Sequence, residues 1–255
     1  MKTSQYLVVI FILCVGLLIY SRTSSNKHIL KDLNVENDVN TNDTAKIPTI
    51  DCPLRKQGIN PHELKPFEEV QKYIDFLNRA DRELWQKPKV ILDALNLKGS
   101  EKVADVGAGS GYFTFRLAKL LPNGKVYAID IEPEMIRHIH HTAVKEKLQR
   151  IEAILATPDN PHVPADADLV FICDVLHHIK DRGDWLKALY SQMKAGSRLV
   201  VIEFKEGDLP EGPPEEMKIT RGEMVALLNN AGFLTTKQNT NMLPYQYYLE
   251  FEKNK

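Results

Sequence analysis

Three glycines at alternate positions, Gly107, Gly109 and Gly111, stand between two carboxylates in the middle of the chain. A short apolar segment precedes them and an amphipathic segment follows, which is typical of a strand, a loop and a helix. Glycines in such a loop let the backbone turn tightly and approach a ligand, with free N–H groups of the helix end pointing at it. Asp105 lies just before the loop, and Asp130 ends the next predicted strand, 23 residues after Gly107. A carboxylate at that second place accepts hydrogen bonds from both hydroxyls of a ribose, so the pattern predicts a nucleoside-containing ligand.

The spacing of the glycines favours one kind of nucleoside ligand over another. A dinucleotide site requires Gly-x-Gly-x-x-Gly, but Tyr112 occupies the sixth position here and the third glycine comes one residue early. The early glycine disfavours a pyrophosphate, whereas Asp105 suits an ammonium group. A nicotinamide-dependent oxidoreductase remains one alternative, and a glycine-rich turn beside a helix-capping carboxylate is the purely structural one.

Strand and helix patterns alternate from residue 66 onwards, which predicts an α/β fold with a mainly parallel sheet. The predicted strands are 102–106, 125–130, 151–156, 168–173 and 198–204, followed by a hairpin near 234–238 and 245–252. The predicted helices are 67–78, 81–95 with a break at Pro88, 113–121, 133–148, 184–193, and one that runs from a capping box at Thr220 to Ala231.

The segments at the predicted strand ends resemble a known family. VADVGAGSGYFT (103–114) and VYAIDIEPEM (126–135) resemble the first two motifs of class I S-adenosylmethionine-dependent methyltransferases. DLVFICDVLHHI (168–179) and KAGSRLVVIEF (194–204) are similar to the branch that contains the ubiquinone/menaquinone C-methyltransferases. RELWQKP (82–88) and LPYQYYLEF (243–251) also resemble bacterial methyltransferases of that branch, type 11/25-like, whose substrate is unassigned. The resemblance covers roughly residues 66–255. It implies a Rossmann-like, doubly wound, seven-stranded sheet with its last strand antiparallel, and S-adenosylmethionine as cofactor.

Site residues follow from the same resemblance, position by position. Asp105 would lie near the cofactor's amine, Asp130 would hold the ribose, and Ile131 would pack against adenine. Many family members place an Asp after the third strand, where this chain has Ala156-Thr157-Pro158, so Thr157 or Asp159 would bond adenine instead. The implied cofactor-binding residues are Asp105, Gly107, Ala108, Gly109, Gly111, Asp130, Ile131, Thr157 and Asp174, the last of which would shape the cofactor pocket or touch the acceptor.

Two adjacent histidines are the candidate catalytic residues. Methyl transfer from a sulfonium is an in-line displacement that needs alignment more than side-chain chemistry, but a phenol or an enolisable carbon also needs a general base. His177 and His178 follow the fourth predicted strand, at the edge where open α/β sheets bind ligands. Either one would serve as that base, or both are hydrogen-bonded loop histidines. No metal site is predicted, because His138 and His141 have no third ligand nearby.

The first 65 residues differ in composition from the rest. Residues 6–20 are apolar, and no charge occurs between Lys2 and Arg22, which predicts a membrane anchor over residues 1–21, with a cleaved signal peptide and export as the alternative. Residues 22–65 are polar and without periodicity, which predicts a flexible tether before a methyltransferase domain at 66–255. A cytosolic cofactor favours a cytoplasm-facing domain, and the anchor favours a small, lipophilic acceptor.

Composition excludes several other classes of protein. With 33 basic and 34 acidic side chains the net charge is −1, which argues against nucleic acid as a partner. The three cysteines, Cys14, Cys52 and Cys173, form no C-x-x-C pair, which argues against a disulfide framework and a structural zinc site. A non-catalytic module that binds S-adenosylmethionine and regulates a partner remains the second alternative. The sequence predicts nothing about the oligomeric state.

Overall fold

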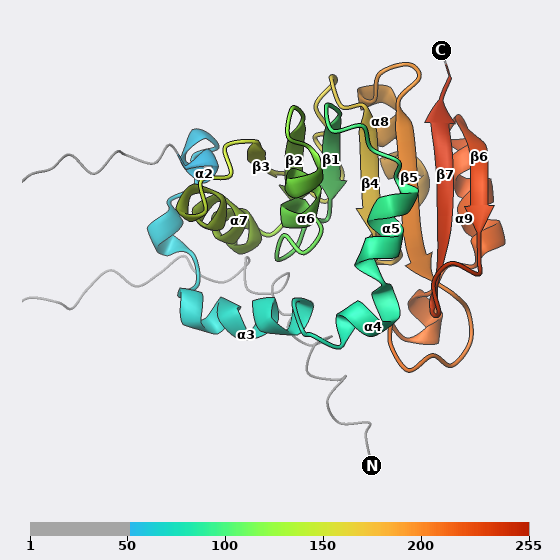
Figure 1. The fold of residues 1–255 in the computed structure, drawn as a ribbon, viewed down its shortest axis with the longest axis horizontal. Helices are drawn as coiled ribbons and strands as arrows, with labels where there is room; N and C mark the ends of the chain where they lie inside the picture. Colours follow the sequence, from blue (N-terminus) through green and yellow to red (C-terminus); the bar gives the residue numbers. More distant parts are fainter. Residues whose placement is uncertain (1–51, 255) are drawn as a thin grey trace, which may run out of the picture. The chain divides into compact units, whose positions relative to one another are not determined.

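The computed structural model describes residues 52–254, which carry one seven-stranded sheet in the order β3-β2-β1-β4-β5-β7-β6 (Figure 1). The strands are β1 (Lys102–Val106), β2 (Lys125–Asp130), β3 (Ile151–Leu155), β4 (Leu169–Cys173), β5 (Arg198–Phe204), β6 (Phe233–Asn239) and β7 (Gln246–Lys253). The five strands from β3 to β5 in this order pair in parallel, and β7 pairs antiparallel with both β5 and β6. The predicted α/β fold with an antiparallel last strand is therefore confirmed.

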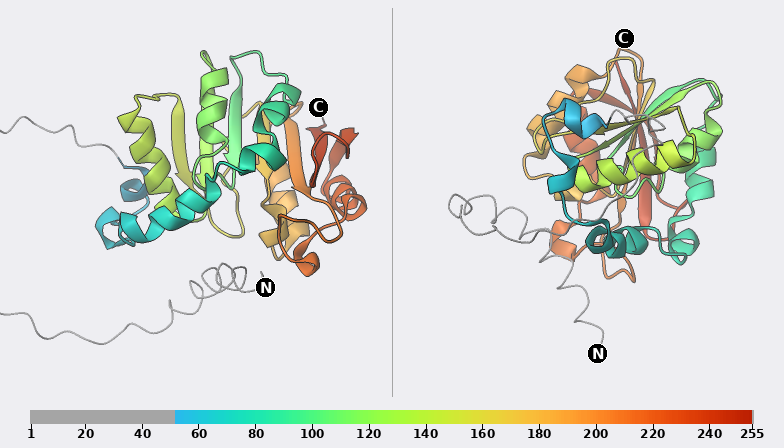
Figure 2. Two further views of the ribbon diagram at one scale, coloured as in Figure 1. Left: turned by 60° about the horizontal axis from the view of Figure 1, so that its bottom comes forward. Right: turned by 90° about the vertical axis from the view of Figure 1, so that its left-hand side faces the viewer.

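Helices flank the sheet on both sides, as Figure 2 shows. They are α2 (Pro53–Lys56), α3 (Phe67–Leu77), α4 (Arg82–Gln86), α5 (Pro88–Ala94), α6 (Thr114–Leu120), α7 (Pro133–Lys145), α8 (Arg182–Gln192) and α9 (Arg221–Asn230), with three short 3-10 turns, η1 (Pro61–Glu63), η2 (Leu176–His178) and η3 (Glu215–Met217). The capping box predicted at Thr220 begins α9, where Thr220 and Glu223 exchange side-chain to backbone hydrogen bonds of 3.1 and 3.0 Å.

Alternate residues of the strands supply two cores, one on each face of the sheet. Val170 and Ile172 of β4 pack with residues of α8 and α9, whereas Leu169 and Phe171 pack with residues of α5 and α6. All four side chains are fully buried. A strand buried on both faces has no polar alternation, which is why the apolar run from 169 to 172 predicted a central strand.

The folded unit begins before the predicted boundary at residue 66. Residues 52–65 were predicted as the last part of a tether, but they contain α2 and η1, and Leu54 is fully buried against Ile136 and Ile139 of α7. Arg137 of α7 also donates to the carbonyl oxygen of Pro61 at 3.1 Å. The apolar side chains of this segment pack in one cluster although its composition is polar, because burial acts on individual side chains: Cys52, Leu54, Ile59 and Leu64.

The predicted anchor at residues 1–21 and the tether up to residue 51 lie outside the described residues. Within residues 52–254, no helix has both the length and the apolar character needed to cross a bilayer.

Truncation of Leu54 tests whether the segment before α3 belongs to the folded domain. We expect Leu54→Ala to lower the free energy of unfolding by about 2–4 kcal/mol, since it removes a fully buried side chain. Leu84→Ala is the matched control, because Leu84 is 78% exposed and its loss should change stability by less than about 0.5 kcal/mol. Urea unfolding of both variants measures the difference, and equal midpoints would contradict docking of residues 52–65.

Candidate cofactor and acceptor site

Parallel pairing brings the carboxyl ends of β1, β2, β4 and β5 to one edge of the sheet. The glycine loop follows β1, Asp130 ends β2, Asp174 follows β4, and Glu203 lies near the end of β5. The helices α3 and α4 lie across this edge, as seen in Figure 1 and in the left view of Figure 2. Leu77 of α3 lies beside Gly109, and Asn78 accepts a 2.8 Å hydrogen bond from the Ser110 hydroxyl.

The glycine loop lies close to two neighbouring segments, the end of β2 and the loop after β4. The N–H groups of Gly107 and Ala108 donate to the carbonyl oxygen of Ile129 at 2.8 and 3.0 Å. Gly107 has a φ of +75°, and a Cβ there would lie 2.2 Å from a Val175 methyl group. Only glycine fits this position, because a side chain would both strain the backbone and collide with the loop after β4.

Asp130 is anchored by the backbone on either side of it. Its two carboxylate oxygens accept hydrogen bonds from the N–H groups of Gly109 at 2.7 Å and Glu132 at 2.9 Å. Burial raises the pKa of Asp130, and these backbone N–H groups oppose the rise. Tyr73 of α3 lies near it: its own pKa is raised by burial and by the charges of Asp130 and Glu132. The neighbouring Ile131 is 49% exposed and free to contact a ligand.

Asp105 is a buried carboxylate with a single side-chain hydrogen bond. It accepts a 2.6 Å bond from the Thr114 hydroxyl at the start of α6. Burial raises its pKa to about 7, with the Thr114 bond opposing the rise and the charge of Asp130 adding to it. A carboxyl group with this pKa gains most from a nearby cation, since a positive ligand favours the ionised form.

Arg82 of α4 supplies a positive charge at the glycine loop. Its guanidinium lies 4.0 Å from the centroid of the Tyr112 ring, directly after Gly111, and donates to the carbonyl oxygen of Leu77 at 2.6 Å. A further hydrogen bond joins Arg82 to the Gln86 side chain. The charge of Arg82 acts on both Asp105 and Asp174, where it lowers the pKa against the effect of burial.

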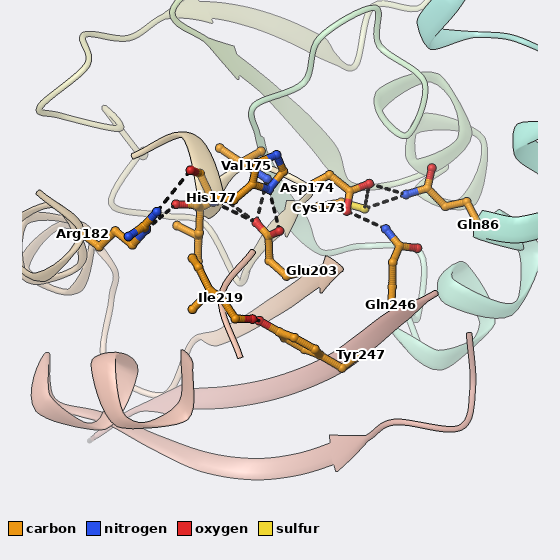
Figure 3. Close-up of polar contacts among 11 residues, drawn as sticks. Gln86, Cys173, Asp174, Val175, His177, Arg182, Glu203, Ile219, Gln246 and Tyr247 are labelled. Carbon is orange, nitrogen blue, oxygen red and sulfur yellow. Dashed lines mark hydrogen bonds and ion pairs between the residues drawn. The ribbon is translucent and has the colours of Figure 1, made fainter. Parts of the chain in front are cut away.

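Asp174 lies between two glutamines at the end of β4 (Figure 3). Gln86 of α4 donates to one of its oxygens at 2.8 Å, and Gln246 of β7 donates to the other. Asp174 has a φ of +61°, a left-handed conformation that Asp tolerates better than most residues. Burial and the charge of Glu203 raise its pKa to about 6.

The two predicted catalytic histidines differ in their surroundings. The buried His177 binds Glu203 through Nδ1 at 2.7 Å, and Glu203 also accepts from the N–H groups of Val175 and Leu176 at 2.9 and 2.6 Å (Figure 3). The bond to Glu203 raises the pKa of His177 although burial lowers it. The ring of His178 lies 4.1 Å from that of His177, and loss of hydration together with this neighbour lowers its pKa to about 4.

The residues after β3 form a small turn of their own. The Thr157 hydroxyl donates to Asp159 at 2.6 Å, and the backbones of Thr157 and Asn160 pair with each other. The N–H of Ala156 donates to the carbonyl oxygen of Asp130 at 2.8 Å, so this turn lies beside the end of β2. Among the residues that the structure describes, no group of three His, Cys, Asp or Glu side chains could hold a metal ion.

Comparison with known proteins decides the family. Residues 97–246 match the methyltransferase domain family. The chain belongs to this family. The described fold is similar to the crystal structure of a SAM-dependent methyltransferase from Aquifex aeolicus, with a TM-score of 0.66 and 26% identity over 71% of this chain and 97% of that one. Human N-acetylserotonin methyltransferase, solved with SAM bound, shares the fold at a TM-score of 0.57 and 23% identity, over 79% of this chain and 62% of that one.

Curated relatives match between about half and three fifths of the chain. The ubiquinone/menaquinone biosynthesis C-methyltransferase of Pasteurella multocida is 27% identical over 52% of this chain and 50% of its own length. The tRNA U34 carboxymethyltransferase of Marinobacter nauticus is 31% identical over 61% of this chain and 46% of its own length. This methyltransferase chain thus spans about half the length of these relatives, and S-adenosylmethionine is the cofactor of its family.

The methyltransferase fold brings most of the predicted site residues to one edge. The ends of β1 and β2 carry the glycines, Ala108, Asp105, Asp130 and Ile131, and Thr157 lies beside them. The segment after β4 carries Asp174, His177 and His178. His177 differs from a free base in that Glu203 holds its Nδ1, which fits the alternative of a hydrogen-bonded loop histidine. Their roles in binding and catalysis stay predictions.

Arg82, Gln86 and Gln246 lie in segments that resemble the family, at 82–88 and 243–251, but the sequence assigned them no role. Arg82 and Gln86 belong to a helix of five residues, which is too short for a periodic pattern to mark one face. Gln246 is fully buried at the start of a strand whose residues are otherwise mostly aromatic and aliphatic. In the sequence, a polar residue at the start of a largely apolar strand, within a segment that resembles the family, is the signal that could have marked Gln246.

The raised pKa of Asp105 predicts how stability depends on pH. Between about pH 4 and 7 the folded chain holds a proton on Asp105 that the unfolded chain has lost, so this group makes the fold less stable as pH rises. Asp105→Asn removes the effect and keeps an acceptor for Thr114. We expect the variant to be more stable than the parent at pH 8, by up to about 4 kcal/mol, and the difference to vanish near pH 4.

Urea unfolding of both proteins at pH 4, 6 and 8 measures this difference. Thr114→Val is the second variant, since it removes the hydrogen bond and leaves the carboxyl group. Unfolding free energies of parent and Asp105→Asn that run parallel across this pH range would contradict the raised pKa.

Proposed function

We propose that this chain transfers the methyl group of S-adenosylmethionine to a small, lipophilic acceptor. The observation that carries the proposal is the position of Asp130, fixed by the N–H groups of Gly109 and Glu132 beside a glycine loop at the carboxyl edge of the sheet. That arrangement suits a ribose whose nucleoside continues along the loop. The quinone-biosynthesis relative and the apolar run at residues 6–20 support a lipophilic acceptor.

In this proposal, each part of the cofactor has a residue at this edge that would bind it. Asp130 would accept from the ribose hydroxyls, the exposed Ile131 would cover adenine, and Thr157 would bond its amine. Asp105 lies before the glycine loop and would face the ammonium group, which favours its ionised form. The loop glycines leave space for the methionine chain.

Arg82 would bind the carboxylate of the methionine part. The cofactor's amino-acid end carries one positive and one negative charge, so an acid alone does not complement it. Arg82 lies over Tyr112, the residue that directly follows the last loop glycine, and its charge reaches Asp105. A guanidinium at that place forms charge-assisted hydrogen bonds to a carboxylate.

The transfer step requires mainly that the acceptor's nucleophile be aligned with the methyl group of the cofactor. The cofactor supplies an activated methyl group, so the acceptor's nucleophile bonds to the methyl carbon while the C–S bond breaks and its electron pair stays on sulfur. The nucleophile's proton goes to a base where the nucleophile is a hydroxyl or an enolisable carbon. His178 is neutral at pH 7 and Asp174 is ionised above about pH 6, whereas Glu203 favours the protonated ring of His177.

The net charge of −1 weighs against tRNA as the acceptor, although one relative is a tRNA-modifying enzyme by name. The described edge carries no basic surplus: four acids lie there, Asp105, Asp130, Asp174 and Glu203, and the positive charges that act on them are those of Arg82, on Asp105 and Asp174, and of His177, on Asp174. A neutral, small acceptor fits this balance better.

Labelled S-adenosylmethionine tests the function directly. We expect the full chain, incubated with methyl-labelled cofactor and a membrane-plus-cytosol extract, to place label in the organic phase. Asp130→Ala should reduce the label at least about 100-fold, since it removes a buried hydrogen-bonded carboxylate from the ribose. Label in the RNA fraction would overturn the acceptor class, and cofactor binding without any transfer would favour a regulatory module instead.

A pair of ligands isolates the role of Arg82. S-adenosylhomocysteine keeps the amino-acid part of the cofactor, and 5′-methylthioadenosine lacks it. We expect Arg82→Leu to weaken S-adenosylhomocysteine binding by about 10- to 100-fold and 5′-methylthioadenosine binding by less than twofold, as measured by calorimetry.

Arg79→Leu is the matched control for this experiment. Arg79 belongs to the same connection between α3 and α4, but it pairs with Glu211 and lies over the Trp85 ring. Its loss should leave both affinities unchanged. An equal loss of affinity for the two ligands in Arg82→Leu would contradict a carboxylate contact.

A further inference from the structure

The side of α4 away from the glycine loop lies in a cluster of aromatic and amide side chains, which we call the α4–β7 cluster: Trp85, Phe204, Tyr245 and Gln246. The Trp85 ring centroid lies 5.8 Å from that of Phe204 and 6.4 Å from that of Tyr245, and the planes of Trp85 and Tyr245 differ by 30°. Trp85, Phe204 and Gln246 are at least nine-tenths buried. Flat apolar surface and buried amide groups thus occur together beside Asp174.

Two polar atoms of the α4–β7 cluster are buried without any hydrogen-bond partner, Nε1 of Trp85 and Oε1 of Gln246. One is a donor and the other an acceptor. Buried polar atoms in folded proteins nearly always have partners, so each such atom calls for an explanation. Both atoms lie next to the edge where the methyl group would be transferred, which points to a ligand as the missing partner.

The orientation of the Gln246 amide is fixed by its neighbour. Its Nε2 donates to Asp174, so a flipped amide would turn Oε1 towards a carboxylate oxygen. Gln86, on the other side of Asp174, uses both ends of its amide. Its Nε2 donates to Asp174 (Figure 3), and its Oε1 accepts from Arg82. Only Gln246 therefore offers a free carbonyl oxygen in this pair.

We propose that the α4–β7 cluster binds the methyl acceptor, and that this acceptor is a neutral, flat ring carrying a hydroxyl or N–H group and a carbonyl group. This inference rests on the proposed function. The ring stacks on Trp85, its donor bonds Oε1 of Gln246, and its carbonyl oxygen accepts from Nε1 of Trp85. The nearby charges of Asp174 and Glu203 disfavour a carboxylate or a phosphate on the ring.

The network that orients the acceptor also reaches the cofactor side. Hydrogen bonds run from Gln246 to Asp174, on to Gln86, and from there to Arg82 at the glycine loop. A ring held by Gln246 thus lies across Asp174 from the residue assigned to the cofactor's methionine part. An acceptor there would lie beside the proposed cofactor site, and proximity of the two reactants is what the transfer step requires.

The loop after β5 covers the α4–β7 cluster. A Cβ on Gly212 would lie 2.6 Å from the Phe204 ring, so the loop backbone touches this ring. Glu211 of the same loop pairs with Arg79, whose guanidinium lies 5.6 Å from the Trp85 ring centroid. The ring enters when this loop moves aside, because the loop contacts Phe204 and holds Arg79 beside Trp85.

Three naphthalenes test the inference by their functional groups. 2-Naphthol offers a donor, 2-acetylnaphthalene offers only a carbonyl, and naphthalene offers neither. Equilibrium dialysis against the full chain saturated with S-adenosylhomocysteine measures their affinities. We expect the first two to bind about five- to tenfold more tightly than naphthalene, because each gains one hydrogen bond to a buried atom.

Two variants test which buried atom, Oε1 of Gln246 or Nε1 of Trp85, provides the gain in affinity of each probe. Gln246→Met should remove the advantage of 2-naphthol and keep that of 2-acetylnaphthalene, and Trp85→Phe should remove the advantage of 2-acetylnaphthalene. Gln238→Met, on the exposed strand β6, is the matched control and should change neither. Thermal unfolding and S-adenosylhomocysteine binding of each variant show that it is folded.

Equal affinities of the three probes for the parent chain would overturn the inference, and this comparison needs no variant. Equal losses for all probes in Gln246→Met would overturn it as well. Neither result would contradict the proposed function. That function is contradicted by a different result, the absence of S-adenosylhomocysteine binding to the parent chain.

Discussion

Buried carboxylates at the ends of parallel strands are the constraint on which the rest of the site depends. The sheet brings Asp105, Asp130 and Asp174 to one edge, and burial raises the pKa of each. Their charges are only partly balanced at the strand ends, where backbone N–H groups bind Asp130 and the hydroxyl and backbone N–H of Thr114 bind Asp105. Arg82 of α4 adds compensation from outside the sheet, because its positive charge lowers the pKa of both Asp105 and Asp174.

The segment from α3 to α4 supplies this compensation, and its geometry follows from one backbone conformation. Lys87, between α4 and α5, has a φ of +49°, which turns α4 away from the sheet-packing helix α5 and across the strand ends. Arg82 then lies over the glycine loop, while Trp85 and Gln86 lie beside Asp174. One short helix thereby contributes side chains to both the proposed cofactor site and the proposed acceptor site.

The sequence predicted the sheet better than the site. The bounds of 102–106, 125–130 and 198–204 were correct, because apolar runs that end at glycine or a charged residue mark strands well. The predicted helix 133–148 was too long, since Lys147 adopts a left-handed conformation that a helical pattern does not reveal. Asp105 and Asp130 were found because their positions are set by a local motif. Gln86 and Gln246 were not, because 160 residues separate two side chains that meet only through Asp174.

The same imbalance of charge links the stability of the folded chain to the binding of a ligand at this edge. At pH 7 and above, an ionised Asp105 opposes folding, since its pKa in the folded chain is about 7. A positively charged ligand beside it reverses the sign of this contribution, because the ionised carboxylate then gains a partner. The folded chain without ligand therefore holds the carboxylate in an unfavourable state, and a cationic ligand bound beside it would release that free energy. A neutral residue at position 105 would make the ligand-free protein more stable than the parent chain, and it would make the complex with a cationic ligand less stable than that of the parent chain.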